Sequence, residues 1–170
     1  MTKNEIICFK GNTLVGTPNG PVKINNINLG DVVYSYDLEL NSLEKAIVRK
    51  IANSYHNKIV KVIFNDKSFL EMTIDHPVWV VGKGWSAIES NEFYKLKLKT
   101  LSIGDKCISI NNNIICLKEI IDIQCLFGDF KMFIISGGIH NIIMANDILV
   151  HDENLVKLEL IEEGIIYNEI

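Results

Sequence analysis

Short apolar runs, separated by turn residues, recur along most of the chain. Residues 59–64 and 69–73 are joined by the turn at 65–68, a pattern typical of a β-hairpin. The same alternation predicts further strands at residues 13–15, 22–27, 32–36, 78–81, 108–110, 114–117, 118–124 and 131–136. Residues 44–52 fit either a helix or a strand, and the β-like neighbours favour a strand. The pattern therefore predicts an all-β fold.

Two other segments are less regular. Residues 91–100 fit a short helix or a loop. In residues 153–170, Leu155, Leu158, Ile161 and Ile165 could line one face of a helix, although Gly164 and the β-branched residues weaken that pattern.

An internal repeat divides the chain into two related halves. Residues 24–35 and 98–109 share their apolar positions and a Gly-Asp turn, at Gly30-Asp31 and Gly104-Asp105. The two aspartates are expected to cap these turns with their side chains. Two copies about half a chain apart are too few for a solenoid and indicate a β fold with two pseudo-symmetric halves.

Length, composition and charge limit the classes of protein to which the chain can belong. A chain of 170 residues with 48% hydrophobic residues can bury the core of one domain. Its formal net charge is -4 and its basic residues are scattered, which argues against nucleic acid as a partner. Apolar runs stay shorter than the roughly 18 residues that span a membrane, and residues 1–5 leave no room for a signal peptide before the first motif.

The four cysteines lie at positions 8, 107, 116 and 125, without CxxC spacing. This spacing gives little support to a zinc cage, a redox pair or a disulfide framework. We expect reduced thiols, a cytoplasmic location, and core positions for Cys107, Cys116 and Cys125.

Three distant segments carry groups that could act together on a peptide bond. Cys8 lies in the apolar stretch at residues 6–15, Thr73 and His76 lie in Thr73-Ile74-Asp75-His76-Pro77, and two further histidines lie in His140-Asn141 and His151-Asp152. A cysteine sulfur can reach the carbonyl carbon that precedes it and form a thioester, provided that donors hold the carbonyl oxygen and protonate the leaving nitrogen.

Each of these elements alone is weak. A lone cysteine among apolar residues is more often a buried structural thiol, and His56, which has no partner in sequence, is interpreted as a surface residue.

In order and spacing, the motifs from Cys8 to Asp152 resemble the Hint superfamily, which contains inteins, bacterial intein-like domains and the autoprocessing domains of hedgehog proteins. The resemblance implies a Hint-type horseshoe of two pseudo-symmetric halves over residues 8–152, with residues 1–7 and 153–170 as flanks. It also implies that Cys8 is the nucleophile of an N–S acyl shift at the Ile7–Cys8 bond. Thr73 and His76 would polarise and protonate that amide, with Asp75 between them. His140 and His151 would assist cleavage near Asp152, and the short interval between Thr73 and His140 would leave no room for an endonuclease.

Three positions depart from the pattern of inteins. Asp152 stands where an intein usually ends in asparagine, so C-terminal cleavage is expected to be slow. Glu153 offers no hydroxyl or thiol to accept an acyl group, so full splicing is not expected. The aspartate that many relatives carry shortly before the downstream histidine is missing from residues 130–134, and Asp129 is displaced from its place.

The leading hypothesis is a single-turnover self-processing domain, of the bacterial intein-like kind. Its partners would be its own flanking polypeptides, with water, a thiol or an amine as acyl acceptor, and it would be a monomer that needs no cofactor or resident metal. One alternative is a Hint fold that has lost activity and serves as a structural or linking module. Another is hedgehog-like transfer to a sterol, for which residues 153–170 are too short. Zn²⁺ bound by the histidines and Cys8 would be an inhibitor rather than a natural ligand.

Overall fold

The computed structural model describes residues 7–90, 97–137 and 140–152, and this part of the chain is almost entirely β-structure. Its strands are β1 (Phe9–Lys10), β2 (Leu14–Val15), β3 (Val22–Lys23), β4 (Val32–Asp37), β5 (Ser42–Ile47), β6 (Lys50–Phe64), β7 (Phe69–Met72), β8 (Val78–Val80), β9 (Gly84–Ala87), β10 (Lys99–Thr100), β11 (Lys106–Asn111), β12 (Ile114–Ser136), β13 (Ile142–Ala145) and β14 (Ile148–His151). The helical element among the described residues is one 3-10 turn, η1 (Ile24–Asn26). The all-β prediction is confirmed.

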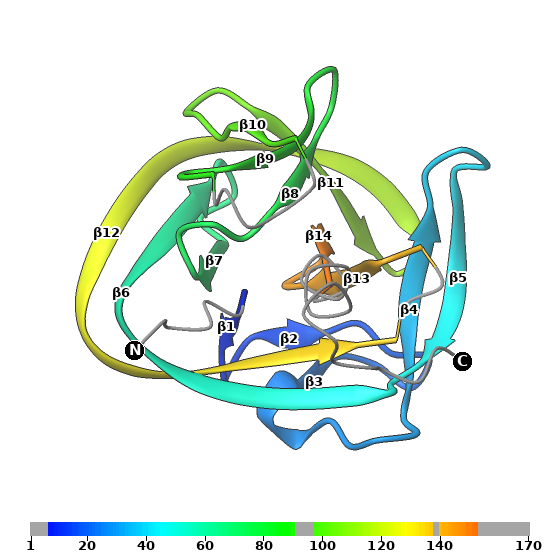
Figure 1. The fold of residues 1–170 in the computed structure, drawn as a ribbon. Coiled ribbons are helices and arrows are strands. Elements are labelled where there is room, and N and C mark those ends of the chain that lie inside the picture. Colours follow the sequence, from blue (N-terminus) through cyan, green and yellow to red (C-terminus); the bar gives the residue numbers. More distant parts are fainter. Residues whose placement is uncertain (1–6, 91–96, 138–139, 153–170) are drawn as a thin grey trace.

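Two long antiparallel strands, β6 and β12, form the outer wall of the molecule. They pair from Ile120↔Phe64 to Ser136↔Lys50, with register shifts between Ile120 and Asp122 and between Phe127 and Phe130. Figure 1 shows both strands curving around the outside, with β13 and β14 lying within the curve. Register shifts of this kind increase local twist and let a long strand bend. The wall therefore wraps around short strands that include β13 and β14.

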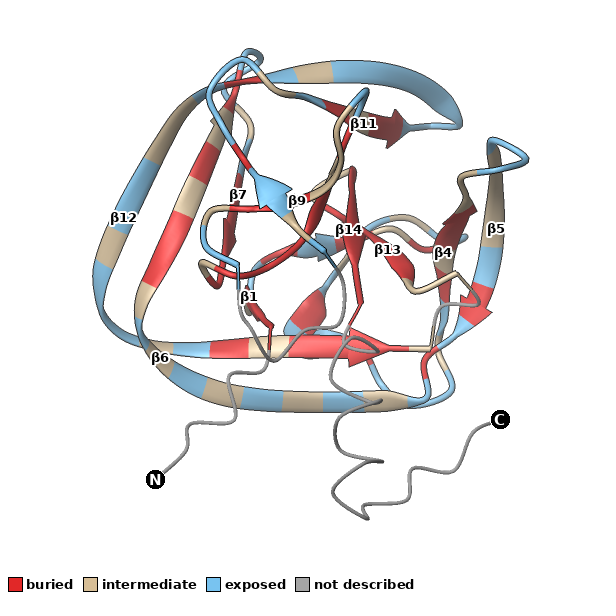
Figure 2. Ribbon diagram, turned by 45° about the horizontal axis from the view of Figure 1, so that its top comes forward, coloured by how far each residue is buried: buried red, intermediate tan, exposed pale blue. Residues whose placement is uncertain are grey.

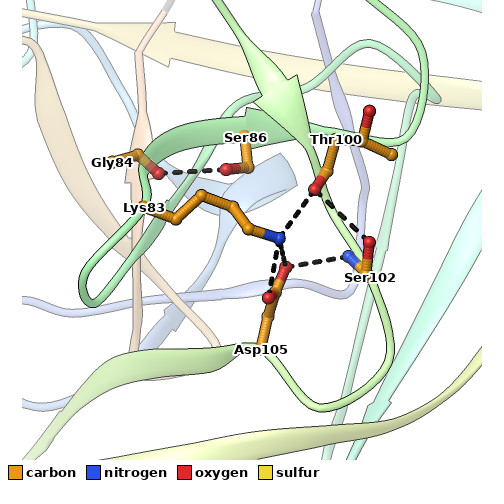
Figure 3. A network of polar contacts seen from close by, with 6 residues as sticks. All are labelled: Lys83, Gly84, Ser86, Thr100, Ser102 and Asp105. Carbon is orange, nitrogen blue, oxygen red and sulfur yellow. Dashed lines mark hydrogen bonds and ion pairs between the residues drawn. The ribbon is translucent and has the colours of Figure 1, made fainter.

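The predicted repeat is visible in the hydrogen bonds of its two turns. Asn28 N donates to Asp31 Oδ2 and Ser102 N donates to Asp105 Oδ2, each over 2.8 Å. Gly30 and Gly104 both have positive φ, at 86° and 93°, as this turn requires. In the second copy Lys83 also pairs with Asp105, at 2.8 Å (Figure 3). The aspartates are thus turn caps, as predicted.

The repeat extends into the hairpins that follow the turns. β4 pairs with β5, and β11 pairs with β12, both antiparallel. Val33 and Cys107 occupy matching buried positions, and so do Ser35 and Ser109. The prediction that Cys107 is a core residue is confirmed.

Three sequence predictions are wrong in detail. Residues 22–27 form only the two-residue β3, after which the chain turns into η1. Residues 44–52 belong to two strands, β5 and β6, rather than one. Cys116 and Cys125 are exposed, because they lie on parts of β12 whose side chains are mostly outside the core.

Two other predictions concern residues that lie mostly or wholly outside the described ones. The sequence predicts a short helix or a loop for residues 91–100. Residues 91–96 lie outside the described ones, and the end of the segment forms β10. The proposed helical face in 153–170 lies outside as well.

Buried residues gather where the short strands meet the inner face of the wall. Figure 2 shows buried segments in β1, β7, β13 and β14, whereas β6 and β12 alternate between buried, intermediate and exposed residues over much of their length. The first described residues are part of this core, since Ile7, Cys8 and Phe9 are all fully buried. No helix formed by the described residues is long and apolar enough to cross a membrane.

Candidate functional site

Cys8 precedes β1, which is held between β7 and β12. Phe9 pairs with Met72 of β7 on one side and with Phe133 of β12 on the other. The end of β7 brings Thr73 beside Cys8, and the two residues exchange hydrogen bonds. Thr73 N donates to Cys8 O over 2.9 Å, and Cys8 N donates to Thr73 Oγ1 over 3.1 Å. The nitrogen of the Ile7–Cys8 amide is therefore bound by the threonine hydroxyl inside the core.

His76 lies one turn after Thr73, with its ring fully buried against Phe9. The two ring centroids are 4.0 Å apart. His76 Nε2 lies 2.9 Å from the carbonyl oxygen of His151. Because a carbonyl oxygen can only accept, Nε2 carries the hydrogen, and Nδ1 of the neutral ring is left as an unprotonated nitrogen. Nδ1 is buried without a hydrogen-bond partner among the described atoms.

Burial sets the protonation state of this histidine. It lowers the pKa of His76 to about 3, against the opposing effects of the backbone at His151 and Cys8. The ring is therefore neutral near pH 7, and the Nδ1 lone pair lies in a buried environment that disfavours its protonation.

The other end of the described chain reaches the same site through β14. His151 is buried, and its ring meets Trp85 edge-on at 4.8 Å between centroids. His151 Nδ1 donates to the backbone carbonyl of Asp152 over 2.6 Å. Burial lowers the pKa of His151 to about 4, which the backbone hydrogen bond at Asp152 partly opposes. A neutral imidazole therefore polarises the carbonyl of the Asp152–Glu153 bond.

Asp152 is fully buried and held by backbone groups. Its nitrogen donates to Asn141 O over 2.9 Å, and Gly137 N donates to its Oδ2 over 3.3 Å. The carboxylate is thus fixed where β12 ends. Cys8, Thr73, His76, His151 and Asp152 form one buried assembly, which we call the junction cluster.

His140 does not point its ring nitrogen into the junction cluster. Its Nε2 lies 2.9 Å from Glu44 Oε2 and 3.5 Å from Asp37 Oδ2, on the β4–β5 hairpin. It is linked to the cluster through its neighbour Asn141, whose carbonyl accepts from Asp152 N. Asp75 is buried between Thr73 and His76.

Sequence reasoning missed two residues that are linked to the sulfur, one directly and one through the other. Ser54 Oγ lies 3.5 Å from Cys8 Sγ, and His56 Nε2 lies 2.8 Å from Ser54 Oγ. The interpretation of His56 as a surface residue is wrong, since it is half-buried and bound to Ser54. The signal was the alternation along β6, which puts residues 52, 54, 56 and 58 on its less exposed face.

Groups able to hold a metal ion gather at one place in the described ranges. Asp37, Glu44 and His140 each offer one ligand atom, and these atoms lie within 4.8 Å of one another. The hydrogen bond between His140 Nε2 and Glu44 Oε2, at 2.9 Å, already uses two of these ligand atoms.

The low pKa values of His76 and His151 make stability depend on pH. Between about pH 6.5 and 5 the unfolded chain binds protons at these two histidines that the folded chain does not, so stability should fall as the pH falls. We expect a loss of about 1.4 kcal/mol per pH unit for each histidine. Urea unfolding at several pH values measures this slope. In His76→Gln the slope should decrease by the contribution of one histidine. An unchanged slope in this variant would contradict the lowered pKa of His76.

Solved structures of inteins share this architecture. The chain is similar to the Ssp DnaB mini-intein variant M86, with a TM-score of 0.71 and 18% identity over 88% of this chain and 96% of that one. It is similar to the gp41-1 intein, with a TM-score of 0.67 and 22% identity over 86% and 98%. It also matches a bacterial intein-like domain from Clostridium thermocellum, with a TM-score of 0.70 and 19% identity over 85% and 98%. At these identities the matches establish the fold.

Comparison by sequence gives a different and shorter match. No curated protein sequence matches the chain. The family model described as the Ataxin-1 and HBP1 module (AXH) matches residues 21–112, which is more than half of the chain. That segment begins after Cys8 and ends before His140 and His151, so it includes only the Thr73 and His76 part of the junction cluster. The chain therefore belongs to the AXH family through residues 21–112, and over most of its length it has the Hint-type fold of minimal inteins.

Proposed function

We propose that this chain is a self-processing domain that cleaves its own backbone at the Ile7–Cys8 bond. The observation that carries the proposal is the buried hydrogen bond of 3.1 Å between Cys8 N and Thr73 Oγ1, with His76 packed against the adjoining Phe9. The hydroxyl holds the amide nitrogen in place, and the nearby imidazole is the group that can supply the proton that the nitrogen needs to leave.

The reaction is an N–S acyl shift. The Cys8 sulfur bonds to the carbonyl carbon of Ile7, and the bond from that carbon to Cys8 N breaks. The sulfur loses its proton, and the nitrogen gains one. The product is a thioester and a free amine. Water, a thiol or an amine then takes the acyl group and releases the N-terminal flank.

The second cleavage would follow Asp152. His151 Nδ1 donates to the carbonyl oxygen of that bond over 2.6 Å, which favours attack on its carbon. Asp152 offers a carboxylate in place of an amide nitrogen, so this step is slow, and Glu153 offers no acceptor for ligation of the two flanks.

Intact-mass measurement tests the first cleavage. In wild-type protein incubated with a thiol, residues 1–7 should be lost as a thioester, and hydroxylamine should release the same segment as a hydroxamate. Cys8→Ala should stay whole under both conditions. If wild type and Cys8→Ala both remain intact while folded, the alternative holds, and the chain is an inactive Hint fold that serves as a structural module. The buried carboxylate at Asp152 is the observation that favours that alternative.

A further inference from the structure

A chain of polar side chains leads from the Cys8 sulfur toward solvent. Cys8 Sγ lies 3.5 Å from Ser54 Oγ, which lies 2.8 Å from His56 Nε2. Cys8 is fully buried, whereas Ser54 and His56 are half-buried. The three groups thus connect a buried thiol to a ring that water can reach.

The pairing of β12 with both β1 and β6 holds Ser54 and His56 on the side of the sheet near Cys8. β12 lies between β1 and β6, so that Met132 pairs with Lys10 on one side and with Ser54 on the other. Ser54 and His56 are two residues apart on one strand, and their side chains therefore point to the same face. His56 pairs with Phe130, at the end of the register shift in β12.

The acyl shift needs a way to remove the thiol proton. Burial in apolar surroundings favours the neutral thiol over the thiolate that attacks the carbonyl. His76 is a poor proton acceptor at neutral pH, since burial lowers its pKa to about 3. The neighbouring cations are already paired: Lys58, on the same face of β6, with Glu89, and Lys10 with Glu71.

We infer that Ser54 and His56 form a proton relay that activates Cys8, an inference that rests on the proposed acyl shift. The thiol gives its proton to Ser54 Oγ as the serine hydroxyl gives its own to His56 Nε2. The sulfur then bonds to the Ile7 carbonyl carbon, and the bond to Cys8 N breaks. The departing nitrogen takes one proton, which water supplies through His76, and the imidazolium of His56 returns one proton to water.

Ser54 is the catalytic residue of the pair, because it touches the reacting sulfur. His56 acts through Ser54 as a positioning residue and proton acceptor. This pair uses a histidine that neither the Thr73–His76 segment nor the C-terminal segment supplies.

The rate of thioester formation against pH tests the relay. Ser54→Ala and His56→Gln should each slow hydroxylamine-trapped cleavage by about 100-fold near pH 7, the scale of one general base. The deficit should shrink as the pH rises, because hydroxide then ionises a growing fraction of the thiol without the relay. Asn57→Ala, at an exposed neighbour on β6, is the matched control and should cleave like wild type. Equal pH profiles in His56→Gln and wild type would overturn the relay.

A second measurement is independent of cleavage. In a Cys116→Ser, Cys125→Ser background, thiolate absorbance near 240 nm up to about pH 9 reports Cys8, since burial raises the pKa of Cys107 to about 12. The thiolate of Cys8 should form at a lower pH with Ser54 and His56 present than in Ser54→Ala or His56→Gln. A difference without any hydroxylamine cleavage would support the relay and refute the self-processing function. Identical titrations would refute the relay even if cleavage occurs.

Discussion

Replacing His76 by alanine should lower the rate of thioester formation at Ile7–Cys8 by about 10²- to 10⁴-fold, the range attributed to one general acid or base. The neutral ring donates from Nε2 to His151 O over 2.9 Å and holds Nδ1 as an unpaired buried nitrogen beside the Cys8 backbone. When Nδ1 is transiently protonated, the low pKa makes the ring a strong acid that gives its proton to the leaving nitrogen of Cys8. Hydroxylamine-trapped cleavage, followed by intact mass, measures the rate.

His76→Gln separates this chemistry from the support that the ring gives to the fold. A glutamine keeps an N–H donor for the His151 carbonyl and fills part of the space beside Phe9, but it cannot carry a proton at the place of Nδ1. Both variants should lose cleavage, while His76→Gln should keep more of the wild-type thermal stability. Folded variants that cleave at the wild-type rate would exclude His76 from the reaction.

The features that sequence reasoning found correctly are those carried by short motifs. A Gly-Asp turn carries its own backbone requirement and its own cap, so Gly30-Asp31 and Gly104-Asp105 could be predicted, and they have the same hydrogen bonds in both halves. The ordered motif around Cys8, Thr73 and His76 likewise predicted that these residues meet, and Thr73 is hydrogen-bonded to Cys8.

The features that it missed depend on where a strand lies in the whole fold. Cys116 and Cys125 stand in apolar runs that read as core, yet β12 is so long that much of it lies outside the core, with Ile114, Ile115 and Leu117 exposed as well. His56 has no partner near it in sequence except Ser54, and its relation to Cys8 exists only because β12 joins β1 to β6. His140 carries the expected spacing, but its ring pairs with Glu44, a contact set by the β4–β5 hairpin.

Replacing Asp152 by asparagine should speed release of residues 153–170 at least tenfold, which corresponds to about 1.4 kcal/mol off the barrier. The side chain is fully buried, and its Oδ2 accepts from Gly137 N over 3.3 Å, a bond that an amide oxygen can keep. The asparagine nitrogen could then attack the carbonyl carbon of its own residue. That carbonyl already accepts a hydrogen bond from His151 Nδ1 over 2.6 Å, which stabilises negative charge developing on its oxygen.

The product distinguishes this route from simple hydrolysis. Attack by the side-chain nitrogen leaves a cyclic imide at the new C-terminus, so the fragment ending at residue 152 should be lighter by one water than the hydrolysed fragment. Asp152→Ala should release nothing, because it has no side-chain nucleophile. His151→Ala combined with Asp152→Asn should lose most of the gain, because the donor to the carbonyl is gone. If Asp152→Asn retained its tail as long as Asp152→Ala does, the Asp152–Glu153 junction would not be a cleavage site, and processing would be confined to Cys8.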